Sequence, residues 1–195
     1  MPDGLSLGLA VGIATGLAGL IAFAAQRAGS LTRDGALAAT LVGSLAMLAG
    51  TAWGLYLVLW FVSASLVSRL GVHVKRARTA SVLPPREARD AWQVLANGGV
   101  FALLAAWALA WPLTWTLWQT WRSAPQVAAS ANSAVMPALA SVMAASALAA
   151  AGADTLATEI GTWLGGTPRS LQSGRAVTPG TSGAVSLAGS LALLE

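Results

Sequence analysis

The sequence predicts an all-α protein, a polytopic membrane helical bundle of about five to six transmembrane helices with the N-terminus outside. Of the 195 residues, 56% are hydrophobic and only 9% are charged, whereas an ordinary soluble domain is about one-quarter charged. The mean hydropathy is +0.68, and a soluble domain of this size could not bury so much apolar surface. The chain has no cysteine, which argues against a disulfide-stabilised secreted module. We therefore expect a single integral membrane domain over residues 1–195, embedded in the lipid bilayer, rather than a soluble enzyme or a disordered chain.

The first apolar run covers residues 5–25, the length needed to cross a hydrocarbon core roughly 30 Å thick. The only charge before it is Asp3, so the run lacks the basic start of a cleavable signal peptide and is interpreted as a retained helix. Glycine recurs at every fourth position near its start, at Gly4, Gly8, Gly12 and Gly16. Such a stripe of small residues lets helix backbones approach closely in lipid.

Five further runs complete the predicted bundle. They cover residues 36–49, 55–67, 91–110, 136–151 and 183–195. The last run is too short to cross the bilayer unaided. We expect Pro112 to interrupt or end the fourth span, and the fifth span to begin after a weak connector at residues 124–133 and to stop at Gly152.

Tryptophan recurs around Pro112 with spacings of four, three and three residues, at Trp111, Trp115, Trp118 and Trp121. These spacings place the rings on one side of a helix. Because tryptophan collects at the headgroup level of membranes, we interpret the cluster as an aromatic belt on an interfacial helix. A base-stacking surface or a ligand cage is the alternative interpretation.

The basic residues predict the orientation. With the N-terminus outside, the inner segments are residues 26–35, 68–90 and 152–182, which hold ten of the eleven basic residues and leave only Arg122 outside. The positive-inside rule disfavours the opposite orientation. Because membrane proteins keep their charges in loops, the pI near 11.1 does not indicate nucleic-acid binding. We expect the polar segments to face the cytoplasm, where nucleotides and phosphorylated metabolites are available.

The first group of candidate site residues lies at the start of the fourth span. On a helix Asp90, Gln93 and Asn97 share one face, and Arg89 lies four residues before Gln93. A polar stripe in an apolar helix is costly unless it faces a cavity or a partner. Gly98 would let a backbone or a ligand come close. Both interhelical hydrogen bonding and ligand binding are consistent with this stripe.

The second group, at the end of the fifth span, combines two acids with two hydroxyls: Asp154, Glu159, Thr155 and Thr158. On a regular helix Asp154 and Glu159 lie about 140° apart, so they need not form one carboxylate pair. Mg²⁺ usually takes one or two carboxylates and completes its shell with water and phosphate oxygens, so these acids are candidate Mg²⁺ ligands. Alternatively, they pair with Arg89 or Arg175.

The third group is the run Gly180, Thr181, Ser182 and Gly183, directly before the last apolar run. Hydroxyl residues between glycines at a helix start offer free backbone N–H groups and a favourable dipole for an anion. The same pattern also fits an ordinary helix N-cap. Lys75 lies in the basic segment, which either sets topology and contacts lipid headgroups or contributes to a site. The sequence contains no Walker-type glycine loop, His/Cys metal cluster or nucleophile triad.

Four runs occur in order along the chain, at residues 30–36, 89–99, 153–161 and 179–183. In this order they resemble the integral membrane family that includes plant phytyl-phosphate kinase and similar animal transmembrane proteins. The resemblance implies phosphoryl transfer from a nucleotide, CTP in the plant enzymes, to an isoprenoid monophosphate, with the diphosphate as product. Similar proteins continue beyond the last run into apolar segments with an Asp-Ser…Gly run. This difference implies that the chain is a truncated form or that another chain completes its last helix.

Such a transfer needs positioning and charge neutralisation more than covalent help from the protein. The expected catalytic residues are Asp154, Glu159, Arg89, Asp90 and Asn97, and the expected substrate- or nucleotide-binding residues are Lys75, Gln93, Gly98, Thr155, Thr158, Gly180, Thr181, Ser182 and Gly183. Of these, Asp154 and Glu159 would hold Mg²⁺. The alternatives are a transporter or carrier for an anionic metabolite or lipid, and a non-catalytic membrane subunit or fragment. The sequence leaves a homo-oligomer open.

Overall fold

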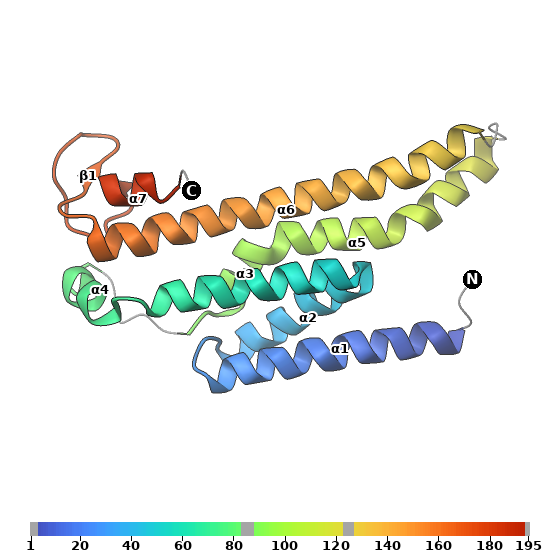
Figure 1. The fold of residues 1–195 in the computed structure, drawn as a ribbon, viewed down its shortest axis with the longest axis horizontal. Coiled ribbons are helices and arrows are strands. Elements are labelled where there is room, and N and C mark those ends of the chain that lie inside the picture. The colour runs from blue at the N-terminus through green and yellow to red at the C-terminus, as the bar shows by residue number, and fades with distance from the viewer. Residues whose placement is uncertain (1–3, 83–87, 123–126, 194–195) are drawn as a thin grey trace. The chain divides into compact units, whose positions relative to one another are not determined.

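The computed structural model describes residues 4–82, 88–122 and 127–193, with side chains except those of residues 4, 5, 119, 121, 122 and 127–134 (Figure 1). The described helices and strands are α1 (Gly4–Arg27), α2 (Arg33–Ala49), α3 (Thr51–Arg69), α4 (Val72–Thr79), α5 (Ala91–Arg122), α6 (Val127–Leu164), β1 (Arg169–Ser170), β2 (Ala184–Val185) and α7 (Leu187–Leu191). The two short strands pair antiparallel, with Arg169 opposite Val185. The predicted all-α membrane fold is confirmed.

Four helices of the described chain are long and apolar enough to cross a membrane. They cover Ser6–Arg27, Thr51–Arg69, Ala91–Trp118 and Val135–Leu164. Of the other predicted spans, α2 has 17 residues, and the last run forms only the five-residue α7. A helix of that length rises about 7.5 Å, so α7 does not cross a bilayer.

The described chain forms two compact units. Unit 1 contains Met1–Val58 and Ala88–Leu148, and unit 2 contains Leu59–Glu87 and Ala149–Glu195. Helices α3 and α6 therefore contribute to both units, whereas each of the other elements belongs to one of them. The three groups of candidate residues divide between the units in the same way, and each unit is described separately below.

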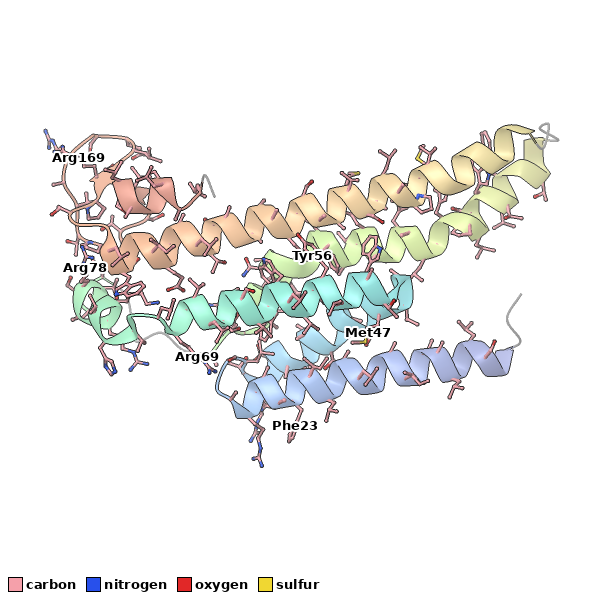
Figure 2. All side chains as sticks on the ribbon, in the orientation of Figure 1. Phe23, Met47, Tyr56, Arg69, Arg78 and Arg169 are labelled. Carbon is pink, nitrogen blue, oxygen red and sulfur yellow. The ribbon has the colours of Figure 1, made fainter. Side chains whose placement is uncertain are left out.

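In unit 1, small residues set the distance between α1 and α2. The buried positions of α1 are Ala14, Ala18 and Ala22. A Cβ on Gly43 of α2 would lie 3.0 Å from the Cβ of Ala18, so these two backbones approach closely, as small residues allow in membrane helices. A Cβ on Gly8, Gly12 or Gly16 would meet no described atom within 4 Å. The closest packing therefore uses alanines of α1 rather than the predicted glycine stripe, and the bulky Phe23 of α1 is exposed (Figure 2).

The expectation that Pro112 ends or interrupts the fourth span is wrong, because α5 continues through Pro112 to Arg122. Proline is tolerated inside membrane helices when neighbouring groups compensate for the lost backbone bond. The bond missing here is the one from Pro112 to the Ala108 carbonyl, whereas the Thr116 hydroxyl donates to the Pro112 carbonyl at 2.7 Å. The rings of Trp107, Trp111, Trp115 and Trp118 follow one another along the helix at centroid distances of 5.4, 5.6 and 5.0 Å. The predicted spacing of Trp111, Trp115 and Trp118 on one face is confirmed, and the side chain of Trp121 lies outside the described set.

In unit 2, α6 does not stop at Gly152 as predicted but continues to Leu164. The predicted connector at residues 124–133 already belongs partly to α6, which begins at Val127. Gly152 serves close packing instead of termination, because a Cβ there would lie 3.1 Å from the indole nitrogen of Trp60 on α3. A glycine inside a helix costs only about 1 kcal/mol relative to alanine, and an apolar helix tolerates that cost. The acids of the second group therefore lie on a helix rather than in a polar loop.

Candidate functional site

The first and second sequence runs of the resemblance meet in unit 1. The Leu31 and Arg89 backbones form an isolated parallel bridge, in which Thr32 N–H donates to the Arg89 carbonyl at 3.0 Å and Arg89 N–H donates to the Ser30 carbonyl at 3.0 Å. A Cβ on Gly35 would collide with the Arg89 carbonyl oxygen. These contacts make residues 30–36 and 89–91 a joint between the starts of α2 and α5.

Asp34 strengthens this joint through a carboxylate held by two donors. Its Oδ1 accepts the Thr32 hydroxyl at 2.5 Å and its Oδ2 accepts the Ala91 N–H at 3.0 Å. These bonds, that of Thr32 first and that of Ala91 second, hold the pKa of the exposed Asp34 carboxyl below its ordinary value. Asp34 was not among the expected site residues, and its place in the joint gives this motif residue a structural role.

The expected polar stripe on α5 begins with a helix cap. Asp90 Oδ1 accepts the Gln93 N–H at 2.9 Å, which is the bond that an N-cap aspartate makes to the third residue of a helix. Gln93 is exposed and Asn97 is half-buried. A Cβ on the buried Gly98 would lie 3.4 Å from Val42 of α2. Within unit 1, therefore, Asp90 begins α5 and Gly98 serves helix packing.

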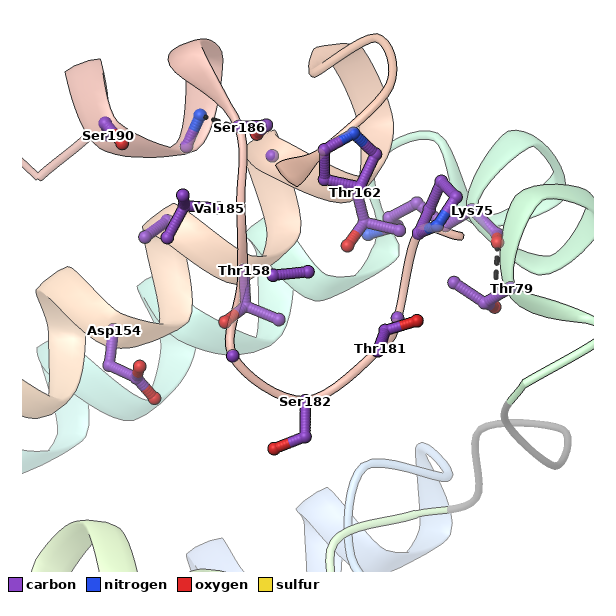
Figure 3. Close-up of a pocket in the computed structure, with 18 of the residues that line it drawn as sticks. Lys75, Thr79, Asp154, Thr158, Thr162, Thr181, Ser182, Val185, Ser186 and Ser190 are labelled. Atoms are coloured by element: carbon purple, nitrogen blue, oxygen red, sulfur yellow. Dashed lines mark hydrogen bonds between the residues drawn. The ribbon is translucent and has the colours of Figure 1, made fainter. Parts of the chain in front are cut away.

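Unit 2 contains a pocket of about 640 Å³ that seven of the other expected residues line. The end of α6, the helix α4, the loop before β2 and the helix α7 surround it (Figure 3). Of the expected site residues it is lined by Lys75, Asp154, Thr158, Gly180, Thr181, Ser182 and Gly183. Three segments that are distant in sequence therefore converge on one pocket. Pocket-lining residues do not include Thr155 or Glu159, although both lie on the same helix α6.

Lys75 and Glu159 form a buried ion pair beside the pocket. Lys75 Nζ lies 2.6 Å from Glu159 Oε2, and the residues are 6% and 2% exposed. The same ammonium donates to the carbonyl oxygens of Ser68 at 2.8 Å and Val67 at 3.4 Å, at the end of α3. The sequence offered Arg89 or Arg175 as partners for the acids, and the structure pairs Glu159 with Lys75 instead.

Asp154 differs from Glu159 in its exposure and in the face of α6 on which it lies. It is exposed and lines the pocket, and its carboxylate has no hydrogen bond or ion pair to another described residue. Thr158 lies one turn further along the same wall (Figure 3), whereas the Thr155 hydroxyl donates back to the Ala151 carbonyl at 2.9 Å. The two acids thus occupy different faces of α6, as their angular separation of about 140° predicts.

A metal ion in this pocket would have one described carboxylate to bind. The described residues contain no group of three or more His, Cys, Asp or Glu side chains that could hold an ion. Mg²⁺ nevertheless often takes a single carboxylate and completes its shell with water and phosphate oxygens. The Asp154 side of the pocket therefore fits Mg²⁺ only in company with a phosphorylated ligand.

The expectation that the hydroxyl run begins the last helix is wrong. Helix α7 begins at Leu187, and its N-cap is Ser186, whose hydroxyl oxygen accepts the Gly189 N–H at 3.2 Å. The run at residues 180–183 is a loop that turns with Gly180 at φ 93° and Gly183 at φ 72°, a left-handed region that favours glycine. Thr181 donates its hydroxyl to the Thr178 carbonyl at 2.8 Å. The run therefore contributes loop donors to the pocket and not a helix terminus.

The comparison with known families identifies the family of the chain. The family model described as integral membrane protein DUF92 matches residues 16–194. The chain belongs to this family. No curated protein and no solved structure matches the chain. Together with the four long apolar helices, family membership makes this DUF92 protein an integral, multi-pass membrane protein.

Sequence reasoning missed two basic residues of α4 in this DUF92 protein. Arg76 lines the pocket and is exposed, and its guanidinium has no hydrogen bond or ion pair to another described residue. Arg78 (Figure 2) donates to the carbonyls of Thr162 at 2.9 Å and Trp163 at 3.0 Å, and also to that of Gly166. Arg78 thereby satisfies carbonyl groups at the end of α6. The short basic run at the start of the predicted inner segment 68–90 could have drawn attention to both residues, but their different contacts become apparent only once α4 is placed.

Proposed function

We propose that this DUF92 protein is a membrane-embedded kinase that uses a nucleoside triphosphate, CTP first among the candidates, to phosphorylate an isoprenoid monophosphate. The observation that carries the proposal is the composition of the unit 2 pocket. One carboxylate, a cationic helix and a loop with hydroxyl groups line the same cavity as the apolar side chains Val72, Val185 and Leu193. A phosphorylated isoprenoid has this combination of an anionic head and an apolar tail.

In the proposed reaction, an oxygen of the isoprenoid phosphate attacks the γ-phosphorus of the nucleotide. The bond between that phosphorus and the β–γ bridging oxygen breaks, so that CDP leaves and an isoprenoid diphosphate forms. Such a transfer depends on alignment and on neutralising the phosphate charge. Asp154 would hold Mg²⁺ together with phosphate oxygens, and the donors of α4 and of the loop would orient the phosphates. Bound Mg²⁺ would neutralise part of the negative charge of the phosphates, and Asp154 would hold the ion.

The size and location of the pocket support this assignment. A volume of about 640 Å³ lies within the roughly 300–1,000 Å³ typical of small-molecule sites. The proposal places this pocket at the cytoplasmic face, because the predicted inner segments carry ten of the eleven basic residues. Nucleotides are available on that side of the membrane.

The test measures transfer of radiolabelled γ-phosphate from CTP to farnesyl monophosphate by the full chain in detergent with Mg²⁺. We expect labelled diphosphate from the parent protein and at least a tenfold loss in Asp154→Asn, because the amide removes the charge that holds the metal. Asp34→Asn is the matched control, since it makes the same chemical change in the unit 1 joint. We expect it to retain transfer at neutral pH.

Three outcomes would contradict the proposal in different ways. Equal transfer by the parent and Asp154→Asn would overturn the metal assignment. A folded parent that binds CTP but transfers no phosphate would favour a non-catalytic subunit. Flux of an anionic lipid or metabolite in proteoliposomes without nucleotide would favour a transporter.

A further inference from the structure

The two cations that line the described pocket differ in the bonds they have already formed. An ammonium group has three donors, and those of Lys75 meet the carbonyls of Val67 and Ser68 and the carboxylate of Glu159. A phosphate could take one of these donors only by breaking an existing bond. Breaking the bond to Glu159 would leave a carboxylate that is 2% exposed without its cation, which is strongly unfavourable.

Arg76 follows Lys75 on α4 but lies about 100° further around the helix. It lines the same pocket, is exposed, and forms no hydrogen bond or ion pair with another described residue. A guanidinium carries five donors in a planar fork that matches two phosphate oxygens. Arg76 therefore has donors available to a ligand, whereas those of Lys75 are occupied.

The loop offers an additional donor toward the same cavity. Ser182 lines the pocket and is exposed, and its hydroxyl has no hydrogen bond within the described chain. Thr181, by contrast, already donates to the Thr178 carbonyl. An anion held by a guanidinium and one hydroxyl would lie in the pocket that Asp154 also lines (Figure 3).

We propose that Arg76 is the residue that binds the phosphate group of the ligand in this pocket, and that Lys75 and Glu159 position α4 without contacting the ligand. The identity of the phosphorylated ligand rests on the proposed function, but the choice of Arg76 rests on the bonds of the two cations. Glu159 is accordingly not a metal ligand, and Asp154 is the carboxylate that remains for Mg²⁺.

Binding of inorganic pyrophosphate to the full chain in detergent with Mg²⁺, measured by calorimetry, tests the assignment without requiring turnover. We expect Arg76→Gln to weaken binding about ten- to a hundredfold, as loss of a charge-assisted hydrogen bond predicts. Arg76→Lys should recover part of the affinity, because it keeps the charge but not the fork. The matched control is Arg175→Gln, an exposed arginine that does not line the pocket, and we expect its affinity to stay within twofold of the parent.

The melting temperature of each variant separates a binding effect from unfolding. Because the Arg76 guanidinium has no partner within the described chain, Arg76→Gln should melt with the parent. Unchanged pyrophosphate affinity in Arg76→Gln, or no binding by the parent, overturns the inference. Parallel titrations of the parent and Arg76→Gln with CTP and with farnesyl monophosphate identify the source of the phosphate. If Arg76→Gln loses affinity for neither ligand, the inference is also overturned. A protein that fails the transfer assay but loses pyrophosphate binding in Arg76→Gln leaves the inference standing while the proposed kinase fails.

Discussion

Replacing Lys75 by methionine should destabilise unit 2 by several kcal/mol while changing little of the local packing volume. The parent pair has an N–O distance of 2.6 Å, which corresponds to about 6 kcal/mol of Coulomb attraction at an effective dielectric constant of about 20. Desolvation of the two ions offsets much of that attraction in the parent. In Lys75→Met the desolvated carboxylate of Glu159, which is 2% exposed in the parent, would remain without its cation. Removal of one member of a buried pair typically costs about 3–5 kcal/mol.

We therefore expect a loss of about 3–5 kcal/mol in the free energy of unfolding at pH 7. The double variant Lys75→Met/Glu159→Leu should recover at least half of the loss, because it removes both buried charges.

The assay is unfolding of the full chain in mixed micelles by added SDS, followed by circular dichroism. Arg175→Met serves as the control, because truncating an exposed arginine outside the pocket should change the free energy of unfolding by no more than about 0.5 kcal/mol. Two results would refute the reasoning: a loss below 1 kcal/mol in Lys75→Met at pH 7, or a double variant that is less stable than the single one.

The remaining predictions concern the unit 1 joint and the topology. Gly35→Ala should destabilise the protein by about 1–3 kcal/mol, because the new Cβ would collide with the Arg89 carbonyl. Gly99→Ala, the matched control with no described atom within 4 Å of the new Cβ, should be neutral or stabilising by up to about 1 kcal/mol, and thermal melts of both variants check the contrast. The lowered pKa of Asp34 means that its stabilising contribution is present above the unfolded value of 3.8 and is lost as the pH falls through the lower folded value. The melting temperature of Asp34→Asn should therefore be lower than that of the parent at pH 7, and this difference should shrink below pH 3.8. Finally, because the chain has no cysteine, Ser173→Cys supplies a single label site in a predicted inner segment; an impermeant maleimide should label it only after the cells are opened, and labelling in intact cells would reverse the proposed orientation.

Composition and hydropathy were sufficient for the fold class, because the cost of exposing so many apolar residues to water decides it without any knowledge of contacts. The ends of the helices were less predictable. Gly152 and Pro112 are residues that end helices in water, but α6 and α5 continue through them, and Gly152 packs closely against Trp60. Whether a helix continues through such a residue depends on its environment in the membrane and on which side chains meet, and local sequence does not contain that information.

Of the candidate site, the separation of the two acids was predictable from the sequence, but the pairing of Glu159 was not. Helical geometry separated Asp154 from Glu159, and the structure places only Asp154 in the pocket wall. The partner of Glu159 was not predictable, since Lys75 is 84 residues away in sequence and becomes a neighbour only when α4 folds against α6. For the same reason sequence patterns could not distinguish the occupied donors of Lys75 from the available donors of Arg76.

The family motifs contain two kinds of polar residue, those bonded within the fold and those that line a pocket, and a sequence pattern cannot separate them. Residues 30–36 and 89–91 contain groups whose bonds are satisfied within unit 1: Asp34 by Thr32 and Ala91, and Asp90 by the Gln93 N–H. The segments that line the unit 2 pocket instead keep Asp154 without a bond to another described residue. A motif group whose bonds are made within the fold has a structural role, whereas an exposed group beside a cavity without such a bond is available to a ligand. Asp34 and Asp90 thus stabilise unit 1, and Asp154 and Arg76 are the residues that the proposed function assigns to a ligand.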